Sequence, residues 1–230
     1  MSMSATTGTE LAGLLQLASP ALPIGGFSYS QGLEAAIDAG YVHDAGSAQR
    51  WIADGLQVMA RGEAVLLARQ CAAWAGADLQ QASRLNASLL ALRETAELRL
   101  EAEQMGASLA RLALELGWGA EGLRAHLATL RPAAYVTSYA FSAVALGVRP
   151  AHAVTAWLYS WVEGQVAASL KAVPLGQMAG QRMLQALRPD IVAAGEAATS
   201  TGDDAVSTFA PMLAILSSRH ENQYSRLFRS

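Results

Sequence analysis

The sequence predicts an all-α fold, a bundle of roughly ten helices in a single domain. Hydrophobic residues make up 52% of the 230 residues, with alanine dominant, and only 15% are charged. This composition is typical of a globular helical protein. Apolar residues recur at helical spacing along the chain, and no run of β-branched residues bounded by turn residues predicts a strand.

The charges and the cysteine count exclude several classes of protein. A net charge of −3 at pH 7 provides no basic surface for phosphates, so we expect no nucleic-acid binding. Lys171 is the only lysine and follows Leu170 rather than glycine, so the chain carries no P-loop. Cys71 is the only cysteine and cannot form a disulfide within the chain. The amino terminus lacks the basic segment of a secretory signal, and we expect a cytoplasmic protein.

Residues 19–34, with the sequence SPALPIGGFSYSQGLE, follow a short helix expected over 11–18. Two prolines favour an extended path, and two adjacent glycines allow a turn that other residues avoid. Ser28 and Gln31 have the spacing of a capping box, which predicts a helix from 28 or 30 to 40. Two explanations stay open: an ordinary loop before a capped helix, and a rigid arm that shapes a surface.

Four more helices are expected before residue 131. A long one begins at Asp44 or Ser47, which can cap it, and ends at Gly76, because glycine is a suitable helix stop. The next three are expected over 78–92, 93–116 and 120–130.

Four acidic and amide side chains share one face of the helix expected over 93–116. They are Glu94, Glu97, Glu101 and Gln104. Such a stripe is either a solvated surface or a partner-binding face.

Residues 132–148 carry no charge, so a membrane span has to be considered. The stretch is shorter than the roughly eighteen residues expected of a span, contains polar side chains, and ends at a helix-breaking Gly147. We instead expect two buried helices packed as a hairpin, the second of which begins at Pro150 and ends at Ala172. No membrane association follows from this segment.

Two further prolines and a polar linker organise the rest of the chain. Pro174 and Pro189 each predict the first turn of a helix. Residues 199–204, TSTGDD, predict a linker. The linker divides the chain into an all-helical domain over 1–204 and a carboxyl-terminal helix with a tail over 205–230.

The segment that begins at the first of these prolines reads PLGQMAGQ. Gly176 and Gly180 are four residues apart, as are Gln177 and Gln181, so each pair lies on one helix face. Tight helix packing and a docking surface both explain this pattern. Lys171, just before the segment, is either an ordinary surface residue or a partner contact.

The sequence shows no pattern of catalytic or metal-binding residues. The four histidines are scattered, and none belongs to a His-x-x-x-His or Cys-x-x-Cys pair. His220 and Glu221 supply metal ligands across a dimer interface in one interpretation, and hydrogen bonds only in the other. Cys71 lies in an apolar stretch and is expected in the core, and no Gly-x-Ser-x-Gly elbow is present. We expect no catalytic residue, no metal ligand, no cofactor and no enzymatic activity.

Residues 219–230, RHENQYSRLFRS, combine arginines with aromatic residues, which are favoured at protein interfaces. Leaving the leucine and phenylalanine in water would forgo roughly 1.5–3 kcal/mol each. Either this domain or another chain should therefore cover them, and an unstructured tail is the alternative. The candidate partner-binding residues of the tail are Arg219, His220, Glu221, Gln223, Tyr224, Ser225, Arg226, Leu227 and Phe228.

Three of these segments together resemble the UreF family of urease accessory proteins. They are SPALPIGGFSYSQGLE at 19–34, PLGQMAGQ at 174–181 and RHENQYSRLFRS at 219–230. Arg93-Glu94 and the triplet QMG at 104–106 are also similar to the middle segment of that family. The resemblance covers nearly the whole chain in the order of the family.

The resemblance implies an all-helical homodimer without catalytic activity. Proteins of this family join a second accessory protein, UreD or UreH, and recruit the GTPase UreG to apo-urease for assembly of the nickel centre. The resemblance also implies that the chain affects the activity of that GTPase. The carboxyl-terminal segment contributes to the UreD/UreH contact in the family, so residues 219–228 are implied as the partner segment here.

Two other hypotheses stay open from the residues alone. In one, the chain is a metallochaperone that itself binds nickel, although scattered histidines and a single cysteine count against this. In the other, it is a helical domain with an unrelated partner.

Overall fold

The computed structural model describes residues 6–202 and 205–230, which form eleven α-helices and one short 3₁₀ turn, with no strand in these ranges. The predicted all-α fold with roughly ten helices is confirmed. Asp203 and Asp204, the last residues of the expected linker, lie outside the described residues. The division into 1–204 and 205–230 stays a prediction.

Most of the helices follow one another after short connections, whereas residues 19–32 separate the first two. In chain order they are α1 (Gly8–Ala18), α2 (Leu33–Asp38), α3 (Ala45–Arg61), α4 (Glu63–Ala75), α5 (Leu79–Ala91), α6 (Ala96–Glu115), α7 (Glu121–Thr129), α8 (Tyr135–Ala145), α9 (Pro150–Ala172), α10 (Gln177–Ser200) and α11 (Pro211–His220).

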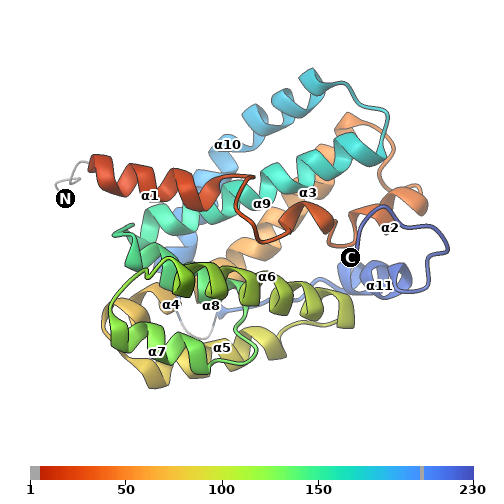
Figure 1. Cartoon of the computed structure of the whole chain (residues 1–230). Coiled ribbons are helices and arrows are strands. Elements are labelled where there is room, and N and C mark those ends of the chain that lie inside the picture. The colour runs from red at the N-terminus through yellow and green to blue at the C-terminus, as the bar shows by residue number, and fades with distance from the viewer. Residues whose placement is uncertain (1–5, 203–204) are drawn as a thin grey trace.

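The long helix α9 runs through the middle of the molecule (Figure 1). It packs along its length against α10, and it also contacts α1, α3 and α4. Helices α4 to α8 form a second group, in which α8 packs chiefly against α4 and α6. Helix α11 contacts α2 and α6. The core fills the space between these layers, and Leu33, Leu56, Tyr139 and Leu158 are completely buried there.

Several helix ends lie where local chemistry predicts them. Asp44 caps α3 in a capping box with Ser47, and Asp78 caps α5. Gly117 follows α6 with a φ of 68°, a left-handed conformation that favours glycine. Pro150 occupies the first turn of α9.

The prediction of one long helix from 44 or 47 to 76 is wrong, because the segment is divided at Gly62 into α3 and α4. A Cβ on Gly62 would lie 2.7 Å from the side chain of Thr208. The backbone N–H of Ser207 donates to the carbonyl of Arg61 at 3.0 Å. A chain segment distant in sequence therefore packs against the break, which local periodicity could not indicate.

Two proline predictions also need correction. Helix α10 begins at Gln177, so Pro174 lies in the connection before it. Pro189 lies inside α10 rather than at the start of a new helix. A proline there costs about 3 kcal/mol by removing a helical hydrogen bond. Leu187 and Ile191 are both buried on either side of it, so packing of this face keeps the helix continuous.

The capping box predicted at Ser28 does not form. Residues Gly26–Ser28 make a 3₁₀ turn, and α2 begins only at Leu33. Gln31 and Gly32 both have positive φ, 50° and 80°. The side chain of Gln31 faces α6 and α9 instead of the start of α2, as described below.

The uncharged segment forms the buried helix α8, in which every residue from Val136 to Ala143 is buried. Its main neighbours are α4 and α6, and its contact with α9 is small. The prediction that α8 and α9 pack on each other as a hairpin is therefore wrong, because α8 packs chiefly on α4 and α6. None of the helices in the described residues combines the length and apolar character needed to cross a membrane.

Helix α1 is fixed to the start of α9 by Glu10. Glu10 Oε1 accepts from the backbone N–H of Arg149 at 3.0 Å and lies 2.9 Å from His152 Nδ1. The Arg149 side chain bonds the same carboxylate and is the main reason that the pKa of Glu10 falls to about 2. The first helix is thus held by an ion pair as well as by its apolar face.

We predict that Gly106→Ala lowers the free energy of unfolding by about 3 kcal/mol, because overpacking in a tight interior forces the backbone to move. A Cβ there would overlap the Ala133 carbonyl at the junction of α6 and α8. Urea denaturation measures the effect. Gly122→Ala in α7 is the matched control, since a Cβ there meets nothing within 4 Å, and it should stabilise by about 0.5–1 kcal/mol. Equal effects of the two changes would contradict the close packing at Gly106.

Cys71 is expected to resist thiol reagents in the folded protein. The side chain is completely buried, which confirms its predicted core position, and burial raises the pKa of the thiol to about 12. Because the thiolate is the reactive form, Ellman's reagent should modify Cys71 only at the rate of unfolding. Reaction at the rate of a free thiol, without denaturant, would show that the core opens there.

Candidate partner-binding site

The carboxyl-terminal tail, residues 221–230, leaves α11 and returns along α2 to the segment 28–30 (Figure 1). The backbone N–H of Arg229 donates to the Ser28 carbonyl at 2.8 Å. The N–H of Ser30 donates to the Ser230 carbonyl, also at 2.8 Å. The tail is therefore ordered by backbone pairing with the arm, and the alternative of an unstructured tail is wrong for this structure.

Glu34, on the first turn of α2, anchors the tail. The residue is only 6% exposed, and Oε1 accepts from the backbone N–H of Leu227 at 2.7 Å. Oε2 accepts from the N–H of Phe228 at 3.0 Å. One buried side chain thus satisfies two backbone donors of a segment that forms neither helix nor sheet.

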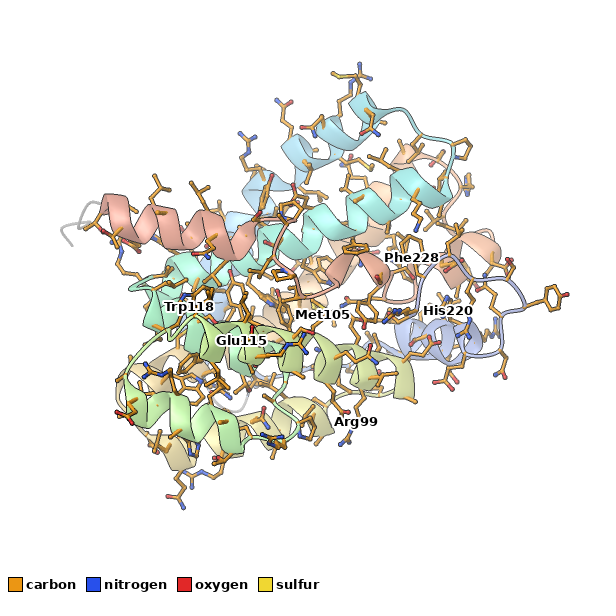
Figure 2. All side chains as sticks on the ribbon, viewed as in Figure 1. Arg99, Met105, Glu115, Trp118, His220 and Phe228 are labelled. Atoms are coloured by element: carbon orange, nitrogen blue, oxygen red, sulfur yellow. The ribbon has the colours of Figure 1, made fainter. Side chains whose placement is uncertain are left out.

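His220, the last residue of α11, lies between two carboxylates. Nε2 is 3.1 Å from Glu34 Oε2, and Nδ1 is 2.8 Å from Glu97 Oε2. The ring is completely buried, and Figure 2 shows it pointing from α11 into the molecule. Arg226 donates to Glu97 Oε1 at 2.9 Å. His220 thus has the hydrogen-bonding role foreseen for it, and it joins α2, α6 and α11.

Glu101 fixes the end of the tail on α6. Its two oxygens accept from Gln31 Nε2 at 2.6 Å and from Ser230 Oγ at 3.0 Å. Burial raises the pKa of Glu101, and these two hydrogen bonds oppose that rise. One turn away, Gln104 accepts from the hydroxyl of Tyr29 at 2.6 Å.

The acidic stripe on α6 is therefore not a solvated surface. Glu101 is buried, and Glu97 is largely covered by the tail, whereas Glu94 lies before the start of α6 and is exposed. The spacing of these residues was visible in the sequence. The signal that could have paired them was the complementary Arg226 of the tail and His220 at the end of α11. Sequence reasoning missed Glu34 and Glu97 as tail anchors.

The apolar residues of the tail divide into a covered and an open set. Phe228 is 6% exposed, and the Lys171 ammonium lies 4.6 Å from the centre of its ring. Leu227 remains 57% exposed, and Tyr224 is fully exposed. The chain thus covers the phenylalanine and leaves the leucine and the tyrosine in water.

The other predicted tail residues are at the surface. Gln223 Nε2 donates to the Ser225 carbonyl at 3.1 Å, which closes a tight loop before Arg226. The side chains of Arg219 and Glu221 are exposed.

The glycines and glutamines of the segment 174–181 have different environments in the structure. A Cβ on Gly180 would lie 2.8 Å from Leu170 of α9, so this glycine serves tight helix packing. Gly176, Gln177 and Gln181 are exposed, and a Cβ on Gly176 would meet nothing within 4 Å. The packing explanation applies to Gly180, and a docking role is open only to the other three.

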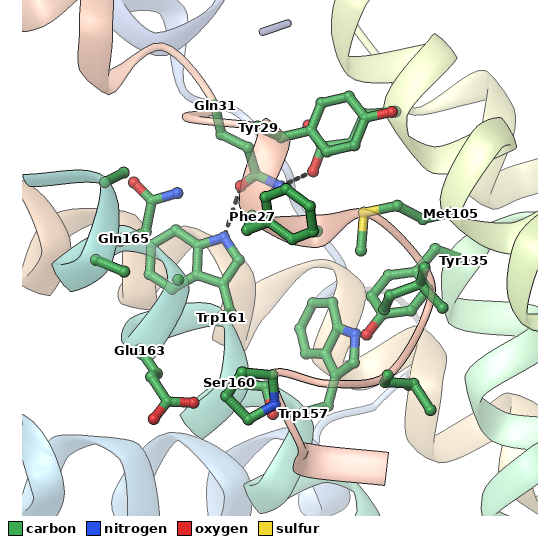
Figure 3. A pocket seen from close by; sticks show the side chains of 18 of the residues that line it. Phe27, Tyr29, Gln31, Met105, Tyr135, Trp157, Ser160, Trp161, Glu163 and Gln165 are labelled. Atoms are coloured by element: carbon green, nitrogen blue, oxygen red, sulfur yellow. Dashed lines mark hydrogen bonds between the residues drawn. The ribbon is translucent and has the colours of Figure 1, made fainter. Parts of the chain in front are cut away.

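A pocket of about 480 Å³ lies beside the tail and was not predicted (Figure 3). The arm at 19–31 forms one wall, α9 forms another, and side chains of α6 and α8 also line it. Trp161 Nε1 donates to Gln31 Oε1 at 2.6 Å. Because Gln31 also bonds Glu101, this one side chain joins the arm to α6 and α9. Two tryptophans one turn apart, Trp157 and Trp161, were the sequence signal available for this wall.

The described surfaces bring together no set of metal ligands. Within the described ranges, no cluster of three or more His, Cys, Asp or Glu side chains is placed to hold a metal ion.

Two comparisons with known proteins give the same description. The family model described as UreF matches residues 42–188. A protein of Polynucleobacter asymbioticus described as "Urease accessory protein UreF" is 52% identical over 225 residues, which cover 96% of this chain and 97% of that protein. The second match extends over nearly the full chain, beyond the limits of the first.

We predict that His220→Ala destabilises the tail and α11 by about 3–5 kcal/mol, because it leaves two buried carboxylates without their common partner. Hydrogen exchange at the amides of Leu227 and Phe228, together with urea denaturation, measures the change. His43→Ala is the matched control, since the His43 side chain is 67% exposed and should change stability by less than about 0.5 kcal/mol. Unchanged exchange at both amides in His220→Ala would refute the anchoring role.

Proposed function

The chain belongs to the UreF family of urease accessory proteins, and we propose that it is a non-catalytic adaptor in the assembly of the urease nickel centre. Together with a UreD/UreH-type protein it recruits a UreG-type GTPase to apo-urease. It also regulates the activity of that GTPase. It acts in the cytoplasm, as a homodimer.

The observation that carries this proposal is the anchored tail with an exposed apolar tip. The buried side chains of Glu34 and His220 hold residues 226–230 in one conformation. The side chains of Tyr224 and Leu227 nevertheless face solvent. A segment ordered before it meets a partner loses less conformational entropy on binding. Tyrosine and arginine are also the residue types that dominate binding energy at interfaces. The tail therefore has the chemistry of a binding surface for the UreD/UreH-type protein.

A second part of the proposed surface runs from the end of α9 to the start of α10. Lys171 covers Phe228, and Gly176, Gln177 and Gln181 are exposed at the start of α10. Exposed amides and a glycine without a side chain allow close approach of another chain. Gly180 is excluded from this surface because it packs on α9.

We expect the double change Tyr224→Ser and Leu227→Ser to abolish co-purification with the UreD/UreH-type protein and leave the thermal midpoint within about 2 °C. Both side chains are exposed, and surface substitutions usually change stability by less than about 0.5 kcal/mol. Affinity capture of the tagged protein from cells expressing the partners, with a thermal melt of each variant, provides both measurements.

The control is Leu100→Ser on α6, since that leucine is also about half exposed but lies outside the tail. It should leave co-purification intact. Normal complex formation by the double variant would show that the tip is not the contact. Full urease activation in cells lacking this protein would remove the proposed function itself.

A further inference from the structure

The pocket between the arm and α9 has aromatic walls and a polar interior. Phe27, Tyr135, Trp157 and Trp161 line it, and Phe27 at its rim is 78% exposed. A volume of about 480 Å³ is within the range of pockets that take small ligands or large side chains. Figure 3 shows the Trp161 indole between Gln165 on one side and Ser160 and Glu163 on the other.

Two polar atoms in this pocket are buried without a partner among the described residues: an amide oxygen, which can only accept, and a hydroxyl, which can donate or accept. Gln165 is only 3% exposed, and its Oε1 forms no hydrogen bond with any described residue. The same is true of Ser160 Oγ, in the described part of the chain. Buried polar atoms are nearly always hydrogen-bonded in native proteins, and leaving them unsatisfied is costly. An occupant of the pocket should therefore bring hydrogen-bond donors.

The charged side chains of the described residues that line the pocket sum to one negative charge, since Glu63, Glu101 and Glu163 face only Arg93 and Lys171. No described residue forms an ion pair or hydrogen bond with the Glu163 carboxylate, and partial burial raises its pKa. The two cationic side chains that line the pocket already have partners. Arg93 pairs with Glu63, and Lys171 lies over Phe228. An occupant should therefore carry positive charge.

We propose that this pocket binds an arginine side chain of a partner protein. A guanidinium group has five N–H donors and no acceptor, stays charged, and stacks on tryptophan faces. It would lie against Trp161 with Glu163 and Ser160 as acceptors. The volume exceeds one side chain, so main-chain N–H groups of the same segment can also enter and donate to Gln165. This inference rests on the proposed function, because it names the chemistry of an adaptor partner.

Other occupants fit the pocket less well. An apolar side chain would fill the aromatic walls but leave Gln165 and Ser160 unsatisfied. Ordered water could satisfy both atoms, but it would not neutralise Glu163. An amine would meet the charge, but it lacks the planar face that stacks on an indole.

The isolated protein, labelled with ¹⁵N, tests the pocket directly. Titration with n-butylguanidinium should shift the indole N–H resonance of Trp161 in a saturable way. N-butylurea, a neutral analogue of the same shape that also carries a carbonyl acceptor, should bind about tenfold more weakly or not at all. The absence of saturable binding by n-butylguanidinium, or equal binding of the two probes, would overturn the proposal.

Two variants connect the binding to the named atoms. Glu163→Gln and Ser160→Ala should each weaken n-butylguanidinium binding by about tenfold, the effect of losing one hydrogen bond to a charged group. Glu115→Gln and Ser88→Ala are the matched controls on exposed positions, and they should bind as the unchanged protein does. Loss of binding in the controls, or full binding in both pocket variants, would contradict the assignment.

A competition experiment connects the pocket to the partner. At saturating concentration, n-butylguanidinium should reduce capture of the UreD/UreH-type protein, and N-butylurea should not. Probe binding without any loss of capture would overturn the assignment to a partner arginine while leaving the adaptor role intact. Failure of capture in the absence of probe would instead refute the proposed function.

Discussion

The buried carboxylate of Glu34 is the interaction on which the carboxyl-terminal half of the candidate site depends. It accepts from the backbone of Leu227 and Phe228 and contacts the ring of His220. The tail has no helical or sheet hydrogen bonds of its own, so its N–H groups need acceptors from elsewhere. Glu34 supplies them from α2, the helix that the arm leads into.

A single polar network extends from this carboxylate across the molecule. His220 connects Glu34 to Glu97 on α6. One turn along the same helix, Glu101 receives hydrogen bonds from both Gln31 and Ser230. Breaking a buried network of this kind is costly because each remaining charge loses its partner. Arm, tail and α6 should therefore order together, which gives an adaptor one preformed surface.

Helix α9 positions both parts of the candidate site. One stretch of it carries the two tryptophans of the pocket, and its last turn carries Lys171, whose ammonium covers Phe228. The pocket and the tail are thus adjacent surfaces on one rigid element. Sites on regular elements hold their geometry better than sites on loops, and this arrangement suits a protein whose proposed work is to bring partners together.

The sequence by itself determined the features that depend on neighbouring residues. Asp44, Asp78 and Pro150 lie at helix starts because a cap or a fixed φ acts within one turn. The tertiary structure decided where distant segments meet: the break at Gly62, the helical position of Pro189, the pairing of the acidic stripe with the tail, and the pocket. These features rest on contacts between residues far apart in the chain, up to 200 positions for Ser30 and Ser230. Local propensity carries no information about such contacts, because packing and burial set their free energy only after the helices have assembled.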